Sequence, residues 1–361
     1  MPKRHIRMIS AAVAVAIPLG AAVCGAVAVP SAQAQTITVS PSRITAHDPK
    51  PVVGMNLYVT DNYSLADVTT WGERDLKYIA DTLKLKAVAI DWDYNVPYYG
   101  ASVVVPSPTR TPTIADLSEL TRIAHSYGLR VEYRALFAIN NSDSRSSSIV
   151  PKNLGAWLRS LLTTETPALR LAQRDHVNEF VVGTEMASVD QSPLWNRFFK
   201  RAKRIYRGAL SYASWGGRAA TGGFFDKGGV RLPTYNLGAT AYPPIALSRY
   251  ATVSQLTKAW ESFLTKYTPA SVLRRTSIDE MGIPAVGGAY HDPWVWTGLT
   301  GTEDPAVQAN WYQAACLAAT AEHMPGLYFW SMPLNSDPAN PYPSLVSWEG
   351  RPASIAAIES C

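Results

Sequence analysis

The 361-residue sequence has few charges, few cysteines and none of the common nucleotide-binding motifs. Charged residues make up 17% of the chain and hydrophobic residues 47%, which excludes wholesale disorder. No Gly-x-Gly-x-x-Gly turn follows the first apolar run, and no Gly-x-Ser-x-Gly elbow supports a serine hydrolase. The scattered histidines lack paired metal-ligand spacing: His125, His176, His291 and His323. We therefore expect an enzyme without metal or cofactor, whose chemistry falls to carboxylates.

The first 34 residues have the pattern of a secretory signal peptide. Pro18 and several glycines interrupt its apolar run, which disfavours the alternative of an uncleaved membrane anchor. We expect a secreted, extracellular protein with no stable membrane association after cleavage, beginning with a polar leader over residues 35–50. The three parts of the signal are the basic Lys3, Arg4 and Arg7, the apolar run from Met8 to Val29, and the small-x-small site Ala32-Gln33-Ala34.

Removal of residues 1–34 takes away three basic residues and leaves 30 basic against 28 acidic residues. This charge of +2 gives no support for nucleic-acid binding. A basic run over residues 197–207 alternates with apolar residues at helical spacing, and we interpret it as a solvated helix face without an assigned partner. Export permits a disulfide between Cys316 and Cys361, with two free thiols as the alternative. We expect a monomer.

Eight short apolar runs alternate with amphipathic stretches, as is typical of parallel strands covered by helices. They predict a single (β/α)8 TIM barrel of the α/β class over residues 51–361, with an open doubly wound sheet as the rival. Thr113 and Asp304-Pro305 are expected to begin helices. Glycine-rich stretches at 215–229 and 282–301 would be loops on the catalytic face. The expected strands are Val52–Val59, Leu85–Tyr94, Arg130–Phe137, Glu179–Met186, Gly208–Ser214, Tyr235–Tyr242, Thr276–Met281 and Gly326–Met332.

Two glutamates lie at the carboxyl ends of expected strands. Glu185 ends the fourth strand and Glu280 ends the seventh. A carboxylate at the end of an apolar strand is unfavourable unless something pairs with it or uses it. The alternative for each is an ion pair with an arginine inside the barrel. Two carboxylates on one rim are also what a retaining glycosidase needs, with a separation of about 5–5.5 Å.

Four short motifs lie on or just after the fourth, sixth, seventh and eighth expected strands: Gly183-Thr-Glu185, Ala241-Tyr-Pro-Pro244, Ile278-Asp-Glu-Met-Gly282 and Leu327-Tyr-Phe-Trp330. With these motifs the chain resembles clan A glycoside hydrolases, most closely the family 113 β-mannanases, from about Val52 to Trp330. The resemblance implies that Glu185 is the acid/base and Glu280 the nucleophile. It also implies that Tyr242 hydrogen-bonds the nucleophile and that Trp330 floors a sugar subsite; a turn and ordinary core packing are the respective alternatives.

Thr184 departs from this resemblance, because clan A enzymes usually carry an asparagine there that contacts the sugar 2-hydroxyl. We expect an endo-β-1,4-mannanase-like, retaining hydrolase of β-linked polysaccharide or oligosaccharide. The alternatives are the same reaction on another β-glycan or a cell-envelope glycan, and a non-catalytic carbohydrate-binding barrel. Further candidates for substrate binding, each with packing, capping or an ion pair as its alternative, are Thr184, Asn56, Tyr58, Asp91, Asp93, Trp294 and Trp296.

Overall fold

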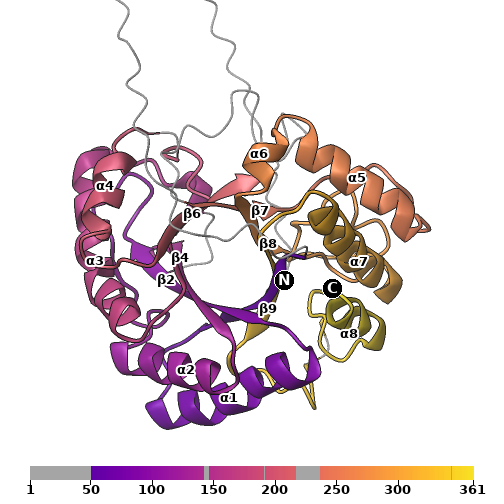
Figure 1. Cartoon of the computed structure of the whole chain (residues 1–361), viewed down its shortest axis with the longest axis horizontal. Helices are drawn as coiled ribbons and strands as arrows, with labels where there is room; N and C mark the ends of the chain where they lie inside the picture. The colour runs from indigo at the N-terminus through magenta and orange to yellow at the C-terminus, as the bar shows by residue number, and fades with distance from the viewer. Residues whose placement is uncertain (1–49, 142–145, 191, 217–235, 343) are drawn as a thin grey trace, which may run out of the picture. The chain divides into compact units, whose positions relative to one another are not determined.

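Eight parallel strands form a closed barrel in the computed structural model, which describes residues 50–361 except 142–145, 191, 217–235 and 343 (Figure 1). Each strand pairs with the next, and β1 pairs with both β2 and β9, which closes the sheet. The barrel strands are β1 Val52–Tyr58, β2 Ala87–Val96, β4 Arg130–Ile139, β5 Glu179–Thr184, β6 Ala209–Gly216, β7 Asn236–Ala241, β8 Thr276–Met281 and β9 Gly326–Pro333.

The closed barrel confirms the expected fold and excludes the open sheet. All eight expected strands are confirmed, with ends that differ from the observed ones by at most two residues. The expected start at Tyr235 lies outside the described residues. A short additional strand, β3 (Val105–Pro106), pairs antiparallel with the end of β2.

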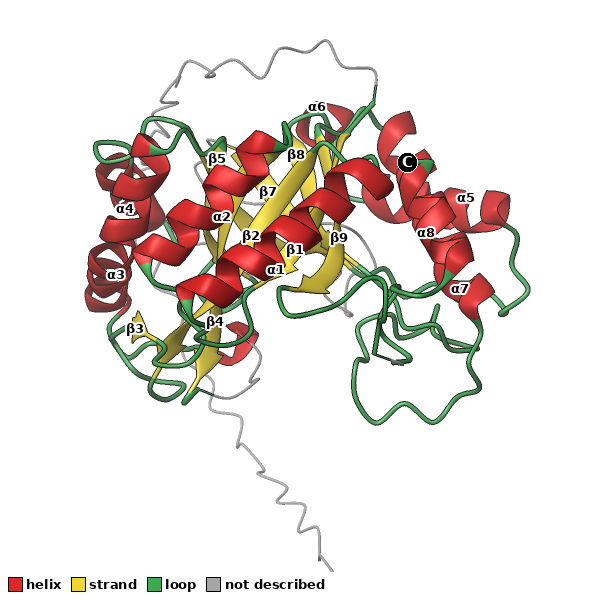
Figure 2. Ribbon diagram, turned by 90° about the horizontal axis from the view of Figure 1, so that it is seen from below, coloured by secondary structure: helices red, strands yellow, loops and turns green. Residues whose placement is uncertain are grey.

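Helices surround the barrel, and in a side view α1 and α2 lie across the strands (Figure 2). Two expected helix starts are confirmed. Thr113 forms a capping box with Asp116, and Asp304 precedes a helix with proline at its first position. The helices are α1 Leu65–Lys77, which continues into the π-helical turn η1 Tyr78–Thr82, α2 Ile114–Ser126, the 3-10 turn η2 Ser146–Ser148, α3 Leu154–Arg174, α4 Trp195–Ala202, α5 Val253–Thr265, α6 Ala270–Leu273, α7 Pro305–Ala321 and α8 Pro352–Glu359.

Most of the bulky aromatic residues serve the core. The fully buried tryptophans pack with other aromatic rings or with the helices: Trp92, Trp157, Trp195, Trp260, Trp311 and Trp348. Ala87, Ala89 and Tyr328 form a second, smaller apolar cluster, separate from the main core. A Cβ at Gly54 would lie 2.5 Å from the ring of Tyr328, so glycine there makes room for the tyrosine. This distribution leaves only a few aromatics for the strand ends.

A disulfide joins Cys316 of α7 to Cys361, with Cα atoms 5.4 Å apart. It fastens the segment that contains α8 to the preceding helix, and it decides the question that the sequence left open. Within the described ranges, no helix has the length and apolar character needed to cross a membrane. The expected signal peptide and all but the last residue of the leader lie outside those ranges, as does most of the glycine-rich stretch 215–229.

Candidate active site

Glu280 reaches the barrel interior through a change of register in β8. Ala239 of β7 is paired with Ile278, but the next residue, Thr240, is paired with Glu280. The extra residue, Asp279, is a β-bulge, and bulges re-aim side chains that would otherwise alternate between the two faces of a sheet. As a result, both Asp279 and Glu280 contact residues that line the barrel.

Two side chains hold the carboxylate of Glu280. The Tyr242 hydroxyl donates a hydrogen bond to Oε1 at 2.5 Å, and Nη1 of Arg134 lies 3.2 Å from Oε2. Glu280 is 8% exposed, so it retains access from the strand ends. Glu280 therefore has both of the partners considered from the sequence. It accepts the hydrogen bond from Tyr242 that the clan A resemblance implies, and it forms the ion pair with an arginine that was the alternative.

Arg134 is fully buried and connects Glu280 to Asp91 and to the backbone of the bulge. Its Nε and Nη2 donate to the two oxygens of Asp91 at 3.1 and 2.8 Å, a bidentate arrangement. Its Nη1 donates to the Asp279 carbonyl, which also accepts from the Asn56 amide at 3.1 Å. Asp91 and Asn56 are 0% exposed. They position the arginine and the bulge, and the geometry gives neither of them a path to a sugar.

Glu185 follows β5 and has a positive φ of 56°, a conformation that is unfavourable for a residue with a Cβ. Its backbone N–H donates to the Ala213 carbonyl at 2.9 Å, and the Thr240 hydroxyl donates to its carboxylate at 2.7 Å. The side chain is half-buried. Thr240 of β7 therefore links the two glutamates, because it is paired with Glu280 in the sheet and holds Glu185 through its side chain.

The charges around Glu280 act on its pKa in opposite directions. Burial is the strongest influence and raises the pKa of Glu280 above its usual value, while Arg134 and the Tyr242 hydroxyl lower it. Burial and the negative charges of Glu280 and Glu185 raise the pKa of Tyr242 well above its usual value. Tyr242 is therefore a neutral donor, close enough to respond to both carboxylates.

Further carboxyl groups lie deeper in the barrel. Asp279 is 1% exposed; burial and the charge of Glu179 raise its pKa to about 8. Its Oδ1 accepts a hydrogen bond from Ser277. Burial and the charge of Asp279 likewise raise the pKa of Glu132 well above its usual value. Burial therefore favours the protonated form of both carboxyl groups.

Trp330 lies in the second half of β9, three residues before the strand ends, and is half-buried. Its ring centroid lies 5.5 Å from that of Tyr58, and the guanidinium of Arg134 lies 5.3 Å from the Trp330 centroid. The Tyr58 hydroxyl donates to Asp93 at 2.6 Å, and Arg110 forms an ion pair with the same carboxylate at 3.2 Å. Three residues predicted for substrate binding are thus in contact with one another: Tyr58 packs against Trp330 and hydrogen-bonds Asp93.

The loop after β8 contributes a second aromatic residue. Trp296 packs edge-on against Tyr242 with centroids 5.8 Å apart. A Cβ on Gly282 would lie 2.9 Å from the Trp296 ring, so glycine permits this approach. Trp294 is half-buried in the same loop. Trp296, more than Trp294, is placed beside the carboxylates.

Thr184 is 2% exposed, and its hydroxyl donates to the Ala135 carbonyl at 3.1 Å. This placement directs the hydroxyl to the backbone of β4, so the expected contact with a sugar has no support in the geometry.

Two residues that contact the glutamates, Arg134 and Thr240, were not predicted from the sequence. Arg134 could have been found by the same feature that identified the glutamates, namely a charged residue in an apolar strand. Thr240 has no such feature, because threonine is ordinary in a strand. Within the described ranges, no group of three or more His, Cys, Asp or Glu residues could hold a metal ion.

A closed parallel barrel with glutamates at the ends of β5 and β8 is the arrangement that (β/α)8 glycoside hydrolases use. Residues 68–341 match the profile of Glycoside Hydrolase Family 113, and the chain belongs to that family. A comparison with curated protein sequences found no match.

Solved structures share the fold at low sequence identity. The family 113 β-mannanase of Alicyclobacillus acidocaldarius is 19% identical, with a TM-score of 0.66 over 85% of this chain and 96% of that one. A second family 113 β-1,4-mannanase is 16% identical, with a TM-score of 0.69 over 85% and 98%. A family 5 enzyme from Streptomyces cattleya, solved with GlcNAc, is 14% identical, with a TM-score of 0.53 over 86% and 80%.

Proposed function

We propose that this glycoside hydrolase cleaves β-1,4-linked mannan by a retaining, double-displacement mechanism. The observation that carries the proposal is the shared setting of the two glutamates. Thr240 of β7 donates a hydrogen bond to Glu185, and Tyr242, two residues further along the chain, donates one to Glu280. A retaining mechanism needs two carboxyl groups on opposite sides of one glycosidic bond.

In the first step, Glu280 attacks the anomeric carbon while Glu185 gives its proton to the leaving oxygen. The bond to the leaving sugar breaks as the bond between Glu280 and the anomeric carbon forms. In the second step, Glu185 takes a proton from water, the water oxygen attacks the anomeric carbon, and Glu280 leaves as a carboxylate. Arg134 and Tyr242 favour the ionised form of Glu280 that both steps require.

The mannan substrate is supported by the family and by what its solved members are called. The matching structures of family 113 are described as β-mannanases and β-1,4-mannanases. Trp330 and Trp296 flank the carboxylates and offer apolar faces for sugar rings. Another β-glycan is the second candidate, since Thr184 replaces the asparagine common in clan A and faces the backbone.

The test is release of reducing ends from β-mannan, xylan, β-glucan and galactan, with wild type and Glu280→Gln compared. We expect wild type to hydrolyse β-mannan and to give the β-anomer first in proton NMR, and Glu280→Gln to lose at least about 10³-fold in rate. Hydrolysis of a different polymer would show that this polymer, and not β-mannan, is the substrate. Full activity of Glu280→Gln would reject the nucleophile.

We also propose that the protein is exported and that residues 1–34 are removed. The disulfide supports this, because such bonds persist in oxidising compartments. N-terminal sequencing of protein from culture medium tests it: the first residue should be Gln35. An intact Met1 on protein that remains in the cell would contradict it. That the exported protein is a monomer stays a prediction.

A further inference from the structure

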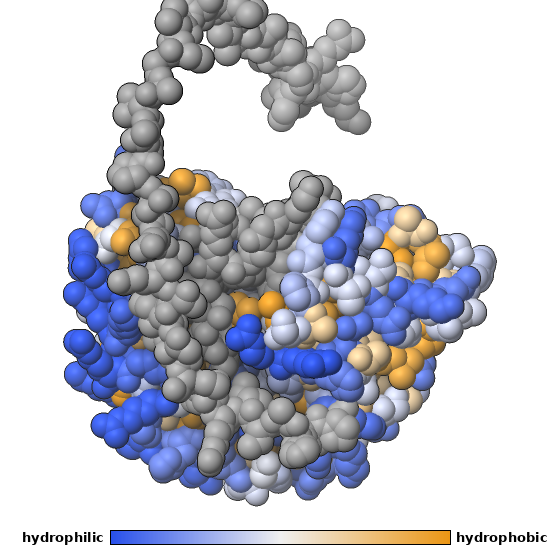
Figure 3. All heavy atoms as spheres, turned by 45° about the horizontal axis from the view of Figure 1, so that its top comes forward, coloured by the Kyte–Doolittle hydropathy of each residue, from blue (hydrophilic) through white to orange (hydrophobic). Residues whose placement is uncertain are grey.

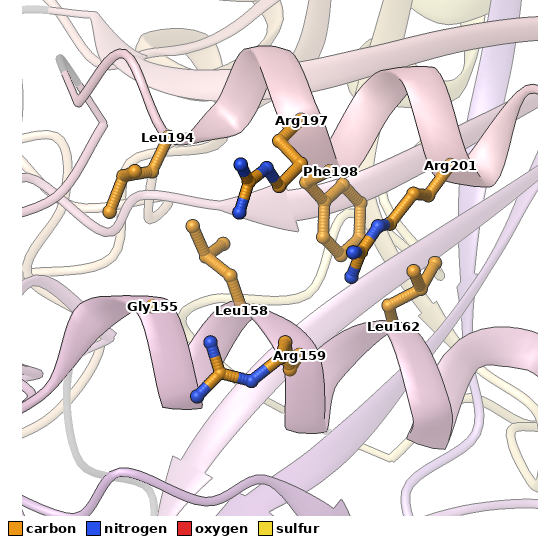
Figure 4. Close-up of a pocket in the computed structure, with 8 residues that line it drawn as sticks. All are labelled: Gly155, Leu158, Arg159, Leu162, Leu194, Arg197, Phe198 and Arg201. Atoms are coloured by element: carbon orange, nitrogen blue, oxygen red, sulfur yellow. The ribbon is translucent and has the colours of Figure 1, made fainter.

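A groove lies between α3 and α4, in the outer layer of helices rather than at the strand ends (Figure 4). Its floor is apolar and is formed by Leu158, Leu162 and Phe198. Its rim carries Arg159 from α3 and Arg197 and Arg201 from α4. Figure 4 shows Arg197 and Arg201 reaching from one helix toward the other, where Arg159 lies.

The spacing along the two helices makes this arrangement. Residues four apart lie on one face of a helix, which places Leu158 beside Leu162 and Arg197 beside Arg201. Phe198 is 3% exposed and packs into the core, so it closes the floor without occupying the groove. Leu194 at the end of the groove is 44% exposed, which leaves an apolar surface open to solvent.

The rim has positive charge without an internal counter-charge. Residues 194–207 contain six basic residues and no acidic residue. Within the described part of the chain, no carboxylate forms an ion pair with Arg159, Arg197 or Arg201. By contrast, Arg122 pairs with Glu73 and Glu119, and Arg174 pairs with Asp175. Like charges four residues apart on a helix weaken it. Hydrophilic side chains cover much of the left side of Figure 3, the side on which α3 and α4 lie in Figure 1.

We propose that this groove binds a linear acidic polysaccharide, a chain of uronate sugars. Each such sugar presents a carboxylate, which a guanidinium can bind through two parallel hydrogen bonds. Each also presents C–H groups that can cover the apolar floor between the arginines. A phosphate polymer would satisfy the charges but would leave the partly exposed Leu162 and the exposed Leu194 without an apolar partner. The chemistry therefore favours a polymer in which charge and apolar surface alternate.

The groove is independent of the catalytic glutamates, and the inference does not rest on the proposed reaction. It would hold the enzyme on an acidic matrix while the barrel acts on a neutral chain. Glu280→Gln should therefore bind the acidic polymer as wild type does. This result would stand even if the substrate or the mechanism were different from those proposed.

The experiment is native affinity electrophoresis of the purified protein in gels that contain polygalacturonate, β-mannan or long-chain polyphosphate. The groove variant is Arg159→Gln/Arg197→Gln/Arg201→Gln, with Arg197→Gln alone as a milder change. The matched control is Lys258→Gln/Arg274→Gln/Arg275→Gln, which removes the same charge from exposed positions elsewhere. Thermal unfolding and hydrolysis of a soluble neutral substrate should be unchanged in all three variants.

We expect polygalacturonate to retard wild type, with affinity that falls as salt is raised. The groove variant should bind about tenfold more weakly, Arg197→Gln about twofold to threefold, and the control within about twofold of wild type. Equal losses of affinity in the groove variant and the control would show that binding depends only on net charge, and this would overturn the proposal. So would equal or tighter binding of polyphosphate, or no retardation of wild type.

Discussion

Tyr242 interacts with two carboxyl groups that, in the proposed mechanism, need opposite ionisation at the start of the reaction. Its hydroxyl donates to Glu280, while the charges of both Glu280 and Glu185 act on its own pKa. Burial raises the pKa of Glu280, so this proposed nucleophile depends on Arg134 and Tyr242 to remain ionised. Removing one of these donors should therefore be visible as a shift in a pH profile.

For Tyr242→Phe we expect the acidic limb of the kcat/KM profile to move up by about one pH unit, because the lost hydrogen bond favoured the charged carboxylate. The rate at the optimum should fall at least about tenfold. Kinetics between pH 4 and pH 9 measure both effects. The exposed Tyr342→Phe serves as the control. An acidic limb that stays in place or moves down would contradict the role given to Tyr242.

Asp279 gives a second prediction at the residue scale. Its folded pKa is about 8, above the unfolded value of about 3.9, so the folded state binds the extra proton between these limits. Wild-type stability should therefore fall as pH rises from 4 to 8, and Asp279→Asn should become more stable than wild type by a few kcal/mol at pH 8. Denaturant titrations at several pH values test this. The exposed Asp292→Asn should show no trend, and a pH-independent difference for Asp279→Asn would refute the account.

At the scale of elements, the register between β7 and β8 positions Glu280, the proposed nucleophile. The jump after the Ala239–Ile278 pair brings both Asp279 and Glu280 to the interior. Gly238 makes this possible, because a Cβ there would lie 1.6 Å from the Asp279 carboxylate. The bulge at Asp279 therefore depends on the absence of a side chain at Gly238.

Gly238→Ala should lower the free energy of unfolding by about 1–3 kcal/mol and reduce activity, because the carboxylate and the bulge must move. Gly238→Ala/Asp279→Ala should recover part of the lost stability, since the shorter side chain removes the clash. Gly155→Ala is the control, because its Cβ would meet only ordinary contacts, the nearest at 3.5 Å. Additive losses in the double variant would argue against the coupling.

The strands could be predicted from the sequence because each is an apolar run that ends at a polar residue or a turn. Glu185 and Glu280 could be found because a carboxylate at such an end is costly. The bulge at Asp279 could not be predicted, since Ile278-Asp-Glu-Met281 gives no local sign of which residue is extra. The destination of the Thr184 hydroxyl depends on β4, a different part of the chain.

At the scale of the whole molecule, the disulfide closes a long segment of chain. Cys316 and Cys361 are 45 residues apart, and the segment between them includes β9 and α8. The sequence could permit this bond but could not choose it over free thiols, because the choice depends on how α7 and α8 pack. Likewise, composition could not show that most tryptophans belong to the core.

Cys316→Ala/Cys361→Ala should lower the free energy of unfolding by up to about 4 kcal/mol, since the unfolded chain gains the freedom of the opened loop. Urea denaturation with and without reductant measures it. Reductant should shift the wild-type midpoint toward that of the variant and leave the variant unchanged. A wild type that is insensitive to reductant after full unfolding and refolding would contradict the prediction.

The most direct test of the central claim is to trap the sugar on the enzyme. A 2-deoxy-2-fluoro mannosyl fluoride slows the second step more than the first, so the glycosyl-enzyme should accumulate, and mass spectrometry of a proteolytic digest locates the adduct. We predict one added sugar on the peptide that contains Glu280, absent in Glu280→Gln. An adduct on Glu185, or turnover with an inverted product and no adduct, would contradict the assignment of Glu280 as the nucleophile.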